Sequence, residues 1–306
     1  MRNNFVKTLL ENAKNDKNIV LMTGDLGFGV LDVFQKTLPE QFINAGISEQ
    51  NMISMAAGMA LSGKKVFVYS IGNFPTLRPL EQIRNDVCYH NADVKIVTIG
   101  GGFAYGSLGM SHHATEDISI MRSLPNMQVL TPGDITETIA ATKYACSNNC
   151  PTYIRLGKGG EPKLHDEKCD YESGKAVLIN EGSNKKTVVF VCGSISEEAI
   201  KANDMLKQKR FEPVNIYSFI SVKPIDEKLI VDCATRYEKI ITVEEHNIIG
   251  GFGGAVAEVL SGIRHNSILK RIGLQDTYSS IVGNQRYLRI RYEMDAAAIA
   301  QEIVCE

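Results

Sequence analysis

The sequence predicts an α/β protein made of two doubly wound domains, each built on a mostly parallel sheet. Two observations lead to this fold class: short apolar strands alternate with helices along the chain, and glycine or polar turns follow the strand ends. A polar stretch rich in turn-forming residues separates two such series. We therefore expect a first domain over residues 1–160, a linker over 161–185 and a second domain over 186–306.

In the first domain, the alternation of strands and helices places a row of turns at one edge of the sheet. An apolar strand at 18–23 ends in Gly24-Asp25-Leu26-Gly27, and glycine turns at 70–74 and 100–103 follow two later strands. Ligands of such sheets bind beyond the carboxyl ends of the strands. The other expected strands are 42–45, 65–70, 94–99, 127–131 and 151–158, and the helices begin near 49, 80 and 134.

The second domain repeats the alternation of strands and helices. Glu244-Glu245-His246 and a glycine-rich turn at 250–254 follow one of its strands, in a pattern that suits an anion-binding or catalytic turn. The expected strands are 187–194, 214–218, 239–243 and 269–272, and the expected helices are 195–209, 227–237, 253–263 and 295–304.

Composition excludes several classes of protein. The chain has 306 residues, enough for two domains, with 44% hydrophobic and 22% charged residues and a formal net charge of −2. No basic run suggests a nucleic-acid surface, and no segment reaches the ~18 apolar residues of a membrane span. The start lacks the apolar segment of a signal peptide. We expect a cytoplasmic protein that binds neither nucleic acid nor membrane.

The cysteines predict no metal site. There are seven, an odd number, and they are scattered along the chain. Only Cys146 and Cys150 lie close together, and no second pair completes a zinc site. We expect reduced thiols in a reducing compartment.

The segment 46–60 predicts a helix that begins with an acidic residue. Apolar residues recur at helical spacing after Ser48, a candidate N-cap, and Gly63 is a candidate stop. Glu49 therefore falls in the first turn, where a carboxylate gains ~0.3 to 1 kcal/mol from the helix dipole.

The string Gly-Ile-Ser-Glu-Gln-Asn-Met at 46–52, followed by this small-residue helix, resembles the pyrimidine-binding domain of transketolases. The resemblance implies that Glu49 bonds the N1′ nitrogen of thiamine diphosphate and favours the imino form of its aminopyrimidine, which acts as the internal base. It also implies that Phe74 stacks on the aminopyrimidine, that Arg78 contributes to the cofactor site, and that Asp25 lies near the cofactor. A core phenylalanine and a polar turn residue are the structural alternatives for Phe74 and Asp25.

A second segment, 106–127, resembles the family's Gly-x-Thr-His-Gln loop and the Arg-x-Leu-Pro-Asn helix end that follows it. His112 matches a histidine that contacts substrate and stabilises the intermediate, so the expected catalytic residues are Glu49 and His112. The neighbouring His112 and His113 lack the spacing of a metal site. Arg155 matches an arginine that binds substrate phosphate, with a surface arginine as the alternative.

Two positions depart from the pattern of sugar-phosphate transketolases. Leu108 stands where these enzymes have an aspartate, and Gly100 stands where they have a phosphate-contacting histidine. The usual sugar phosphates are therefore in question, and an unusual acceptor such as a nucleotide-linked keto sugar is an open hypothesis.

The resemblance covers nearly the whole chain but includes no diphosphate-binding domain. It implies one subunit of a split transketolase, active with a separate N-terminal subunit that holds Mg²⁺ and the diphosphate, in an α2β2 assembly. We expect an exposed apolar face for that partner. No metal is expected on this chain, because Leu26 replaces a glycine of the family's metal motif. The resemblance also gives the turn at 250–254 a structural role, without catalysis by His246.

Two other functions remain open from the sequence. One is the β subunit of a 2-oxoacid dehydrogenase E1 component, which shares this architecture. The other is a noncatalytic scaffold subunit that has kept the fold.

Overall fold

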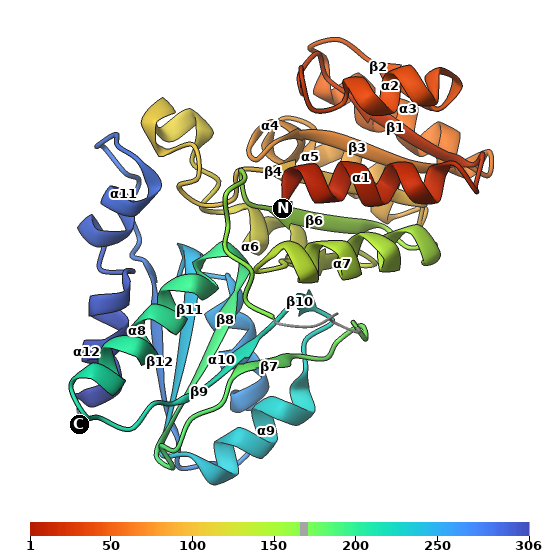
Figure 1. Ribbon diagram of the computed structural model, residues 1–306. Helices are drawn as coiled ribbons and strands as arrows, with labels where there is room; N and C mark the ends of the chain where they lie inside the picture. The colour runs from red at the N-terminus through yellow and green to blue at the C-terminus, as the bar shows by residue number, and fades with distance from the viewer. Residues whose placement is uncertain (166–170, 306) are drawn as a thin grey trace.

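The computed structural model describes residues 1–165 and 171–305, which form two α/β units side by side (Figure 1). The first unit is built on a seven-stranded sheet whose strands pair in parallel, except that β10 is antiparallel to β5. Its order is β10 (Ser221–Lys223), β5 (Gln128–Leu130), β6 (Thr152–Leu156), β4 (Val94–Ile99), β3 (Lys65–Ile71), β1 (Ile19–Thr23) and β2 (Phe42–Asn44).

Helices cover both faces of this sheet, as its continuous apolar strands require. One core joins helices α1 and α7 to one face, and a second core joins α3, η2 and α6 to the other. The helices are α1 (Arg2–Ala13), α2 (Asp32–Thr37), α3 (Glu49–Leu61), α4 (Phe74–Leu77), α5 (Leu80–Gln82), α6 (Asp117–Ser123) and α7 (Ile135–Ser147), with short 3-10 turns η1 (Pro39–Gln41), η3 (Gly106–Leu108) and η4 (Met110–His112) and a π-helix η2 (Ile83–Cys88).

The second unit is a five-stranded sheet with helices on both faces. Its strands are parallel apart from the edge strand β7, which runs antiparallel to β9. Helices α8 and α12 pack on one face, and α9 and α10 on the other. The strand order is β12 (Ile268–Leu274), β11 (Lys239–Asn247), β8 (Thr187–Cys192), β9 (Asn215–Ser218) and β7 (Val177–Asn180), and the helices are α8 (Ser196–Gln208), α9 (Glu227–Arg236), α10 (Phe252–Ser261), α11 (Gln285–Arg291) and α12 (Ala296–Val304), with the 3-10 turn η5 (Gly193–Ile195).

The two units are less separate than the sequence suggests. Strand β7 lies inside the stretch 161–185 that was expected to be a linker, and it pairs with the second sheet. Strand β10 belongs to the second half of the chain but completes the first sheet. The core that contains α3 and α6 also continues into α9 and α10. Strand β7 therefore belongs with the second sheet, and the expected division into 1–160, 161–185 and 186–306 otherwise remains a prediction.

Two further points concern helices. The helix expected to begin near residue 80 is a short α-helix that continues as the π-helix η2. In the described part of the chain, no helix is long and apolar enough to cross a membrane.

Candidate active site

The candidate site lies at the edge of the first sheet where its parallel strands end. Helix α3 follows β2, helix α4 follows β3, and the turns η3 and η4 follow β4. Because β4, β3, β1 and β2 are neighbours in the sheet, these segments meet at one edge. Glu49, Phe74, Arg78 and His112 come from these segments.

Glu49 is the first residue of α3 and is only 7% exposed. Arg78 Nη1 donates a hydrogen bond to Glu49 Oε1 at 2.7 Å, and the Arg78 side chain is 51% exposed. No residue of the described chain bonds Glu49 Oε2. Ser48 occupies the N-cap position, but its Oγ donates to the Ala45 carbonyl at 2.8 Å, so the expected side-chain cap is not formed. One oxygen of a nearly buried carboxylate is thus available.

Phe74 connects this ion pair to His112. The Arg78 guanidinium carbon lies 4.5 Å from the centre of the Phe74 ring, a cation–π contact. The Phe74 and His112 rings meet edge to face, with ring centres 5.2 Å apart and an interplanar angle of 68°. The structure therefore brings four of the expected site residues into one contact series, Glu49–Arg78–Phe74–His112.

His112 ends the turn η4 and is half-buried. Its Nδ1 lies 3.0 Å from Ser111 Oγ. Burial, together with the nearby His113, lowers the pKa of His112 and favours the neutral ring. His113 points inward, where its Nε2 lies 3.1 Å from the Gly106 carbonyl oxygen. The two adjacent histidines thus face different surroundings.

Asp25 lies at the same edge, in a left-handed backbone conformation with φ of 58°. Its backbone N–H donates to Asn44 Oδ1 at 3.0 Å, and Asn44 Nδ2 donates to Asp25 Oδ1 at 3.1 Å. Asn44 Oδ1 also accepts the Gly46 N–H at 3.0 Å. Asp25 therefore braces the loop that leads into Glu49.

Arg155 does not fit the substrate role expected of it. It is 4% exposed and lies within β6. Its Nε donates to Asp117 Oδ2 at 2.7 Å, and its Nη2 donates to the carbonyl oxygens of Ala114 and Glu245 at 2.8 and 2.9 Å. The guanidinium is committed inside the protein, where it joins the loop after β4 to the second domain. We do not carry the phosphate-binding role of Arg155 further.

Tyr105 and Lys158 were not among the expected site residues. Gly100 has φ of 89°, and a Cβ at this position would overlap the Tyr105 ring. Lys158 Nζ lies 4.9 Å from the centre of that ring, and the Tyr105 and His112 ring centres are 6.4 Å apart. The departure at Gly100 was a signal in the sequence, but only the fold shows which ring fills the space.

A buried charge network holds the loop after β4 against the second domain. Glu245 Oε1 accepts the Phe103 N–H at 2.7 Å, and Arg289 Nη2 donates to Glu245 Oε2 at 2.6 Å. Gln285 Nε2 also bonds this carboxylate, at 2.9 and 3.0 Å. These contacts fix the position of the loop that carries His112.

Glu244 and His246 flank this network and face the protein interior. The Glu244 carboxylate accepts the N–H groups of Phe252 and Gly253 at the start of α10, at 2.6 and 2.8 Å. Burial raises the pKa of Glu244 to about 7. Burial lowers the pKa of His246 to about 4, and its Nδ1 lies 2.6 Å from the Asn247 carbonyl oxygen. These contacts support a structural role for the turn at 250–254.

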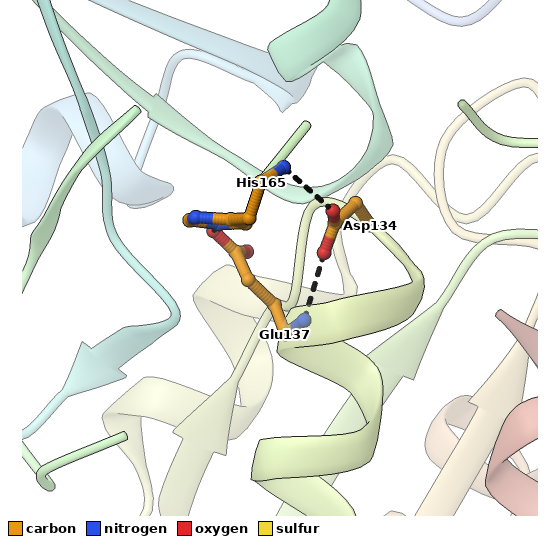
Figure 2. Close-up of side chains that lie close together, drawn as sticks. All are labelled: Asp134, Glu137 and His165. Carbon is orange, nitrogen blue, oxygen red and sulfur yellow. Dashed lines mark hydrogen bonds and ion pairs between the residues drawn. The ribbon is translucent and has the colours of Figure 1, made fainter. Parts of the chain in front are cut away.

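Asp134, Glu137 and His165 have the donor types of a metal site (Figure 2). Their oxygen and nitrogen atoms, however, already bond one another and the backbone. Asp134 accepts the N–H groups of Glu137 and Leu164 at 2.7 Å each, and His165 Nε2 lies 2.8 Å from Glu137 Oε1. Glu137 Oε2 accepts the Ser218 hydroxyl of β9 at 3.0 Å. The cluster ties α7 to the second sheet, and we assign it no metal.

Family models match almost the entire chain. Residues 1–162 match the pyrimidine-binding domain of transketolase, and residues 174–299 match the transketolase C-terminal domain.

Three similar proteins have nearly the same length as this chain. A putative transketolase C-terminal section from Methanocaldococcus jannaschii is 37% identical, over 100% of this chain and 96% of the relative. A subunit of an apulose-4-phosphate transketolase from Phocaeicola vulgatus is 36% identical, over 98% of this chain and 95% of the relative. A solved structure described as a split gene transketolase, inactive beta4 tetramer, is 34% identical with a TM-score of 0.87, over 99% of this chain and 96% of that one.

Proposed function

Because the chain belongs to the transketolase family, we propose that it is one subunit of a split, thiamine diphosphate-dependent transketolase. The complex would transfer a two-carbon ketol unit from a ketose donor to an aldose or keto-sugar acceptor. The observation that carries this proposal is the contact series Glu49–Arg78–Phe74–His112, which joins a nearly buried carboxylate, an aromatic ring and a neutral imidazole.

The residues at this edge fit the pyrimidine half of thiamine diphosphate. When bound, the cofactor supplies the carbon nucleophile that takes up and passes on the ketol unit. Glu49 would bond the N1′ nitrogen through its available Oε2, and Phe74 would offer a flat apolar surface to the ring. Arg78 now covers one face of Phe74, and its exposure leaves it free to share or yield that face. Asp25 would steady the loop before Glu49.

His112 would act on the substrate. We assign His112 the tautomer in which Nδ1 accepts a hydrogen bond from the Ser111 hydroxyl, 3.0 Å away, so that the proton of the neutral ring is on Nε2. That N–H can donate a hydrogen bond to a substrate oxygen as negative charge develops there. The lowered pKa of His112 keeps this neutral form dominant near pH 7.

A separate subunit with the diphosphate-binding domain would complete the site and hold Mg²⁺ and the diphosphate. Apolar side chains around the site are exposed, among them Phe28 at 79%, Ile47 at 75%, Met110 at 56% and Leu108 at 54%. Such side chains mark a surface that another protein covers. We propose an α2β2 assembly in the cytoplasm, and the free thiols of the six described cysteines suit a reducing compartment.

The proposal is tested by titrating thiamine diphosphate with Mg²⁺ into the chain alone and into its mixture with a candidate diphosphate-domain subunit. Calorimetry is expected to detect tight binding only in the mixture. Glu49→Gln should abolish ketol transfer in the mixture, whereas the matched control Glu238→Gln, at an exposed position, should not.

Three outcomes contradict the proposal. Tight binding by the chain alone would remove the need for a partner. Full activity of Glu49→Gln in the mixture would favour the noncatalytic scaffold, and release of CO2 from a 2-oxoacid without ketol transfer would favour the dehydrogenase subunit.

A further inference from the structure

Asn73 directs its side chain at the loop that carries His112. It occupies the N-cap position of α4 but forms no side-chain cap bond. Its Nδ2 instead donates to the His113 carbonyl oxygen at 2.7 Å and to the Ser111 carbonyl oxygen at 3.4 Å. These two carbonyls belong to the residues on either side of His112. One amide group therefore contacts the main chain before and after the candidate catalytic histidine.

The partners of the Asn73 amide decide its orientation. A carboxamide has a donor end with two N–H groups and an acceptor end, and only the donor end satisfies two carbonyl oxygens. Asn73 is 9% exposed, and its bond to the His113 carbonyl is buried. Because a buried carbonyl that loses its partner is costly, this bond favours one arrangement of the loop.

The segment that carries Asn73 is itself held in place. Gly72, which precedes it, donates its N–H to the Ile99 carbonyl oxygen of β4 at 3.0 Å. A Cβ at Gly72 would overlap the Cβ of Ala114, so this backbone lies directly against the end of the loop that carries His112. Asn73 therefore offers the loop a fixed point at the edge of the sheet.

The bonds within the turn η4 set its shape but not its position. The His112 N–H bonds the Gly109 carbonyl oxygen at 2.9 Å, and the His113 N–H bonds that of Met110 at 3.1 Å. Both bonds join residues that are three apart in the chain. The bonds from Asn73 come from the segment after β3 and therefore place the turn against the rest of the first domain.

Asn73 also directly precedes Phe74, the residue expected to stack on the cofactor. The Phe74 ring meets the His112 ring edge to face, with ring centres 5.2 Å apart. Two consecutive residues thus contact the main chain around His112 and its ring. The position of the imidazole relative to the expected stacking surface depends on this one short segment.

We propose that Asn73 is a positioning residue for ketol transfer: its amide holds the main chain on both sides of His112 and thereby fixes the imidazole beside Phe74. Asn73 acts through His112. A displacement of about 1 Å in a reacting group can lower a rate about 100-fold, so a bond that fixes the loop has a large effect on turnover. This inference rests on the transketolase function proposed above.

The first test is a double-mutant cycle in the assembled complex. The donor is β-hydroxypyruvate, which passes its two-carbon ketol unit to an aldehyde and releases CO2, and the acceptor is D-glyceraldehyde 3-phosphate. Asn73→Ala should lower kcat about 10-fold or more and leave the Kd of thiamine diphosphate with Mg²⁺ unchanged. In a complex that carries His112→Ala, the same change should lower kcat no further, because the residue through which Asn73 acts is gone. Equal fold losses in the two backgrounds would overturn the proposal.

Two further variants complete the cycle. Asn15→Ala is the matched control, since Asn15 Nδ2 also donates to a main-chain carbonyl, that of Glu11 at 3.1 Å, but at an exposed position on α1. It should leave kcat unchanged. Asn73→Asp keeps the size of the side chain and replaces the donor N–H groups with an oxygen, which covers the case that Asn73→Ala does not fold. Wild-type kcat in either Asn73 variant, or loss of the folded circular dichroism spectrum in both, would contradict a positioning role.

Hydrogen exchange in the chain alone separates failure of this inference from failure of the proposed function. The reporters are the N–H groups of His112 and His113, which are bonded within η4. Asn73→Ala should speed their exchange about 10-fold, as loss of a hydrogen bond that holds the turn predicts, and leave exchange in β8 unchanged. Asn15→Ala should alter neither.

If the wild-type complex transfers no ketol unit, the transferase proposal fails and the exchange data alone decide whether Asn73 holds the turn. Faster exchange confined to the turn η4 and its flanking residues would support the contact. Equal exchange in the wild type and Asn73→Ala, or the same acceleration throughout the chain, would overturn it.

Discussion

The candidate active site and the charge network between the domains use the same residue types in opposite ways. At the site, Arg78 is half-exposed and bonds one carboxylate, that of Glu49. In the network, Arg155 is buried, and its guanidinium bonds Asp117 and two carbonyl oxygens. In the proposed function Arg78 shares its position with a ligand, and a side chain with that role is expected to lie near solvent with few bonds. A side chain that fixes a loop is buried with several.

The largest effect should come from breaking the buried pair. Arg155→Ala leaves the Asp117 charge buried without its partner, and loss of one member of a buried pair costs about 3–5 kcal/mol. Arg78→Ala removes a half-exposed partner and should cost at most about 1 kcal/mol. Urea unfolding of both variants measures the contrast. Similar losses of stability in the two variants would mean that burial does not determine how much each arginine contributes to the free energy of unfolding.

Glu49→Gln should show the opposite profile from Arg155→Ala. The change keeps the size of the side chain but removes the carboxylate, so ketol transfer by the assembled complex should fall about 100-fold or more. The free energy of unfolding should change by no more than about 1 kcal/mol, because the partner Arg78 is half-exposed and the glutamine side chain can still accept its hydrogen bond. Steady-state kinetics and urea unfolding of the same preparation check both halves of this prediction.

Glu244 and His246 should give opposing pH dependences of stability. The raised pKa of Glu244 stabilises the fold below its ordinary value of 4.5, and this stabilisation is lost as pH rises toward about 7. The lowered pKa of His246 stabilises the fold above its ordinary 6.5, and this is lost as pH falls toward about 4. Between about pH 4.5 and 6.5 the two slopes offset each other.

Single substitutions should reveal separately how each residue makes the free energy of unfolding depend on pH. In His246→Gln the free energy of unfolding should fall with rising pH, relative to wild type, by up to about 1.4 kcal/mol per unit. In Glu244→Gln it should rise with pH over the same window. Unfolding curves at several pH values measure both, and parallel profiles in the two variants would contradict the assignment.

The smallest effect concerns the cluster of Asp134, Glu137 and His165. Burial of His165 opposes its protonation, but the bond to Glu137 outweighs this and raises the pKa of His165. The stabilisation is therefore full below the ordinary pKa of His165 and is lost as pH rises through the folded value. His165→Gln should cost about 1 kcal/mol near pH 5.5 and less near pH 8.5.

Thermal unfolding of His165→Gln at the two pH values provides the measurement. The control is His90→Gln, at an exposed histidine. A stability loss that grows with pH would show that the bond to Glu137 does not favour the charged ring.

Much of the architecture could be predicted from the sequence, because strands buried on both faces of a parallel sheet have continuous apolar sequences, such as 94–99 and 187–192. Strand β10 could not, since three residues are too few to carry a pattern and their partner lies far away in the chain. The π-helix at 83–88 was also missed, because helical spacing does not distinguish it from an α-helix.

The candidate site divides in the same way. Glu49 and His112 stand in strings specific enough to recognise, and the structure places them at one edge of the sheet. Arg155 and Lys158 both lie at the end of the same strand, and the sequence does not show which of them turns inward. Burial decides this, and it depends on helix α6 and the second domain, which pack against that strand.

Strand β10, which the second half of the chain contributes to the first sheet, also sets an order for biosynthesis. Until residues 221–223 have left the ribosome, strand β5 remains an open edge with unpaired backbone groups. The first sheet is therefore incomplete when residues 1–160 have been synthesised, and the nascent chain exposes a β edge while all of α8 and β9 is being made. For the same reason, a fragment that stops at residue 160 lacks strand β10, leaves the edge strand β5 unpaired, and is expected to aggregate.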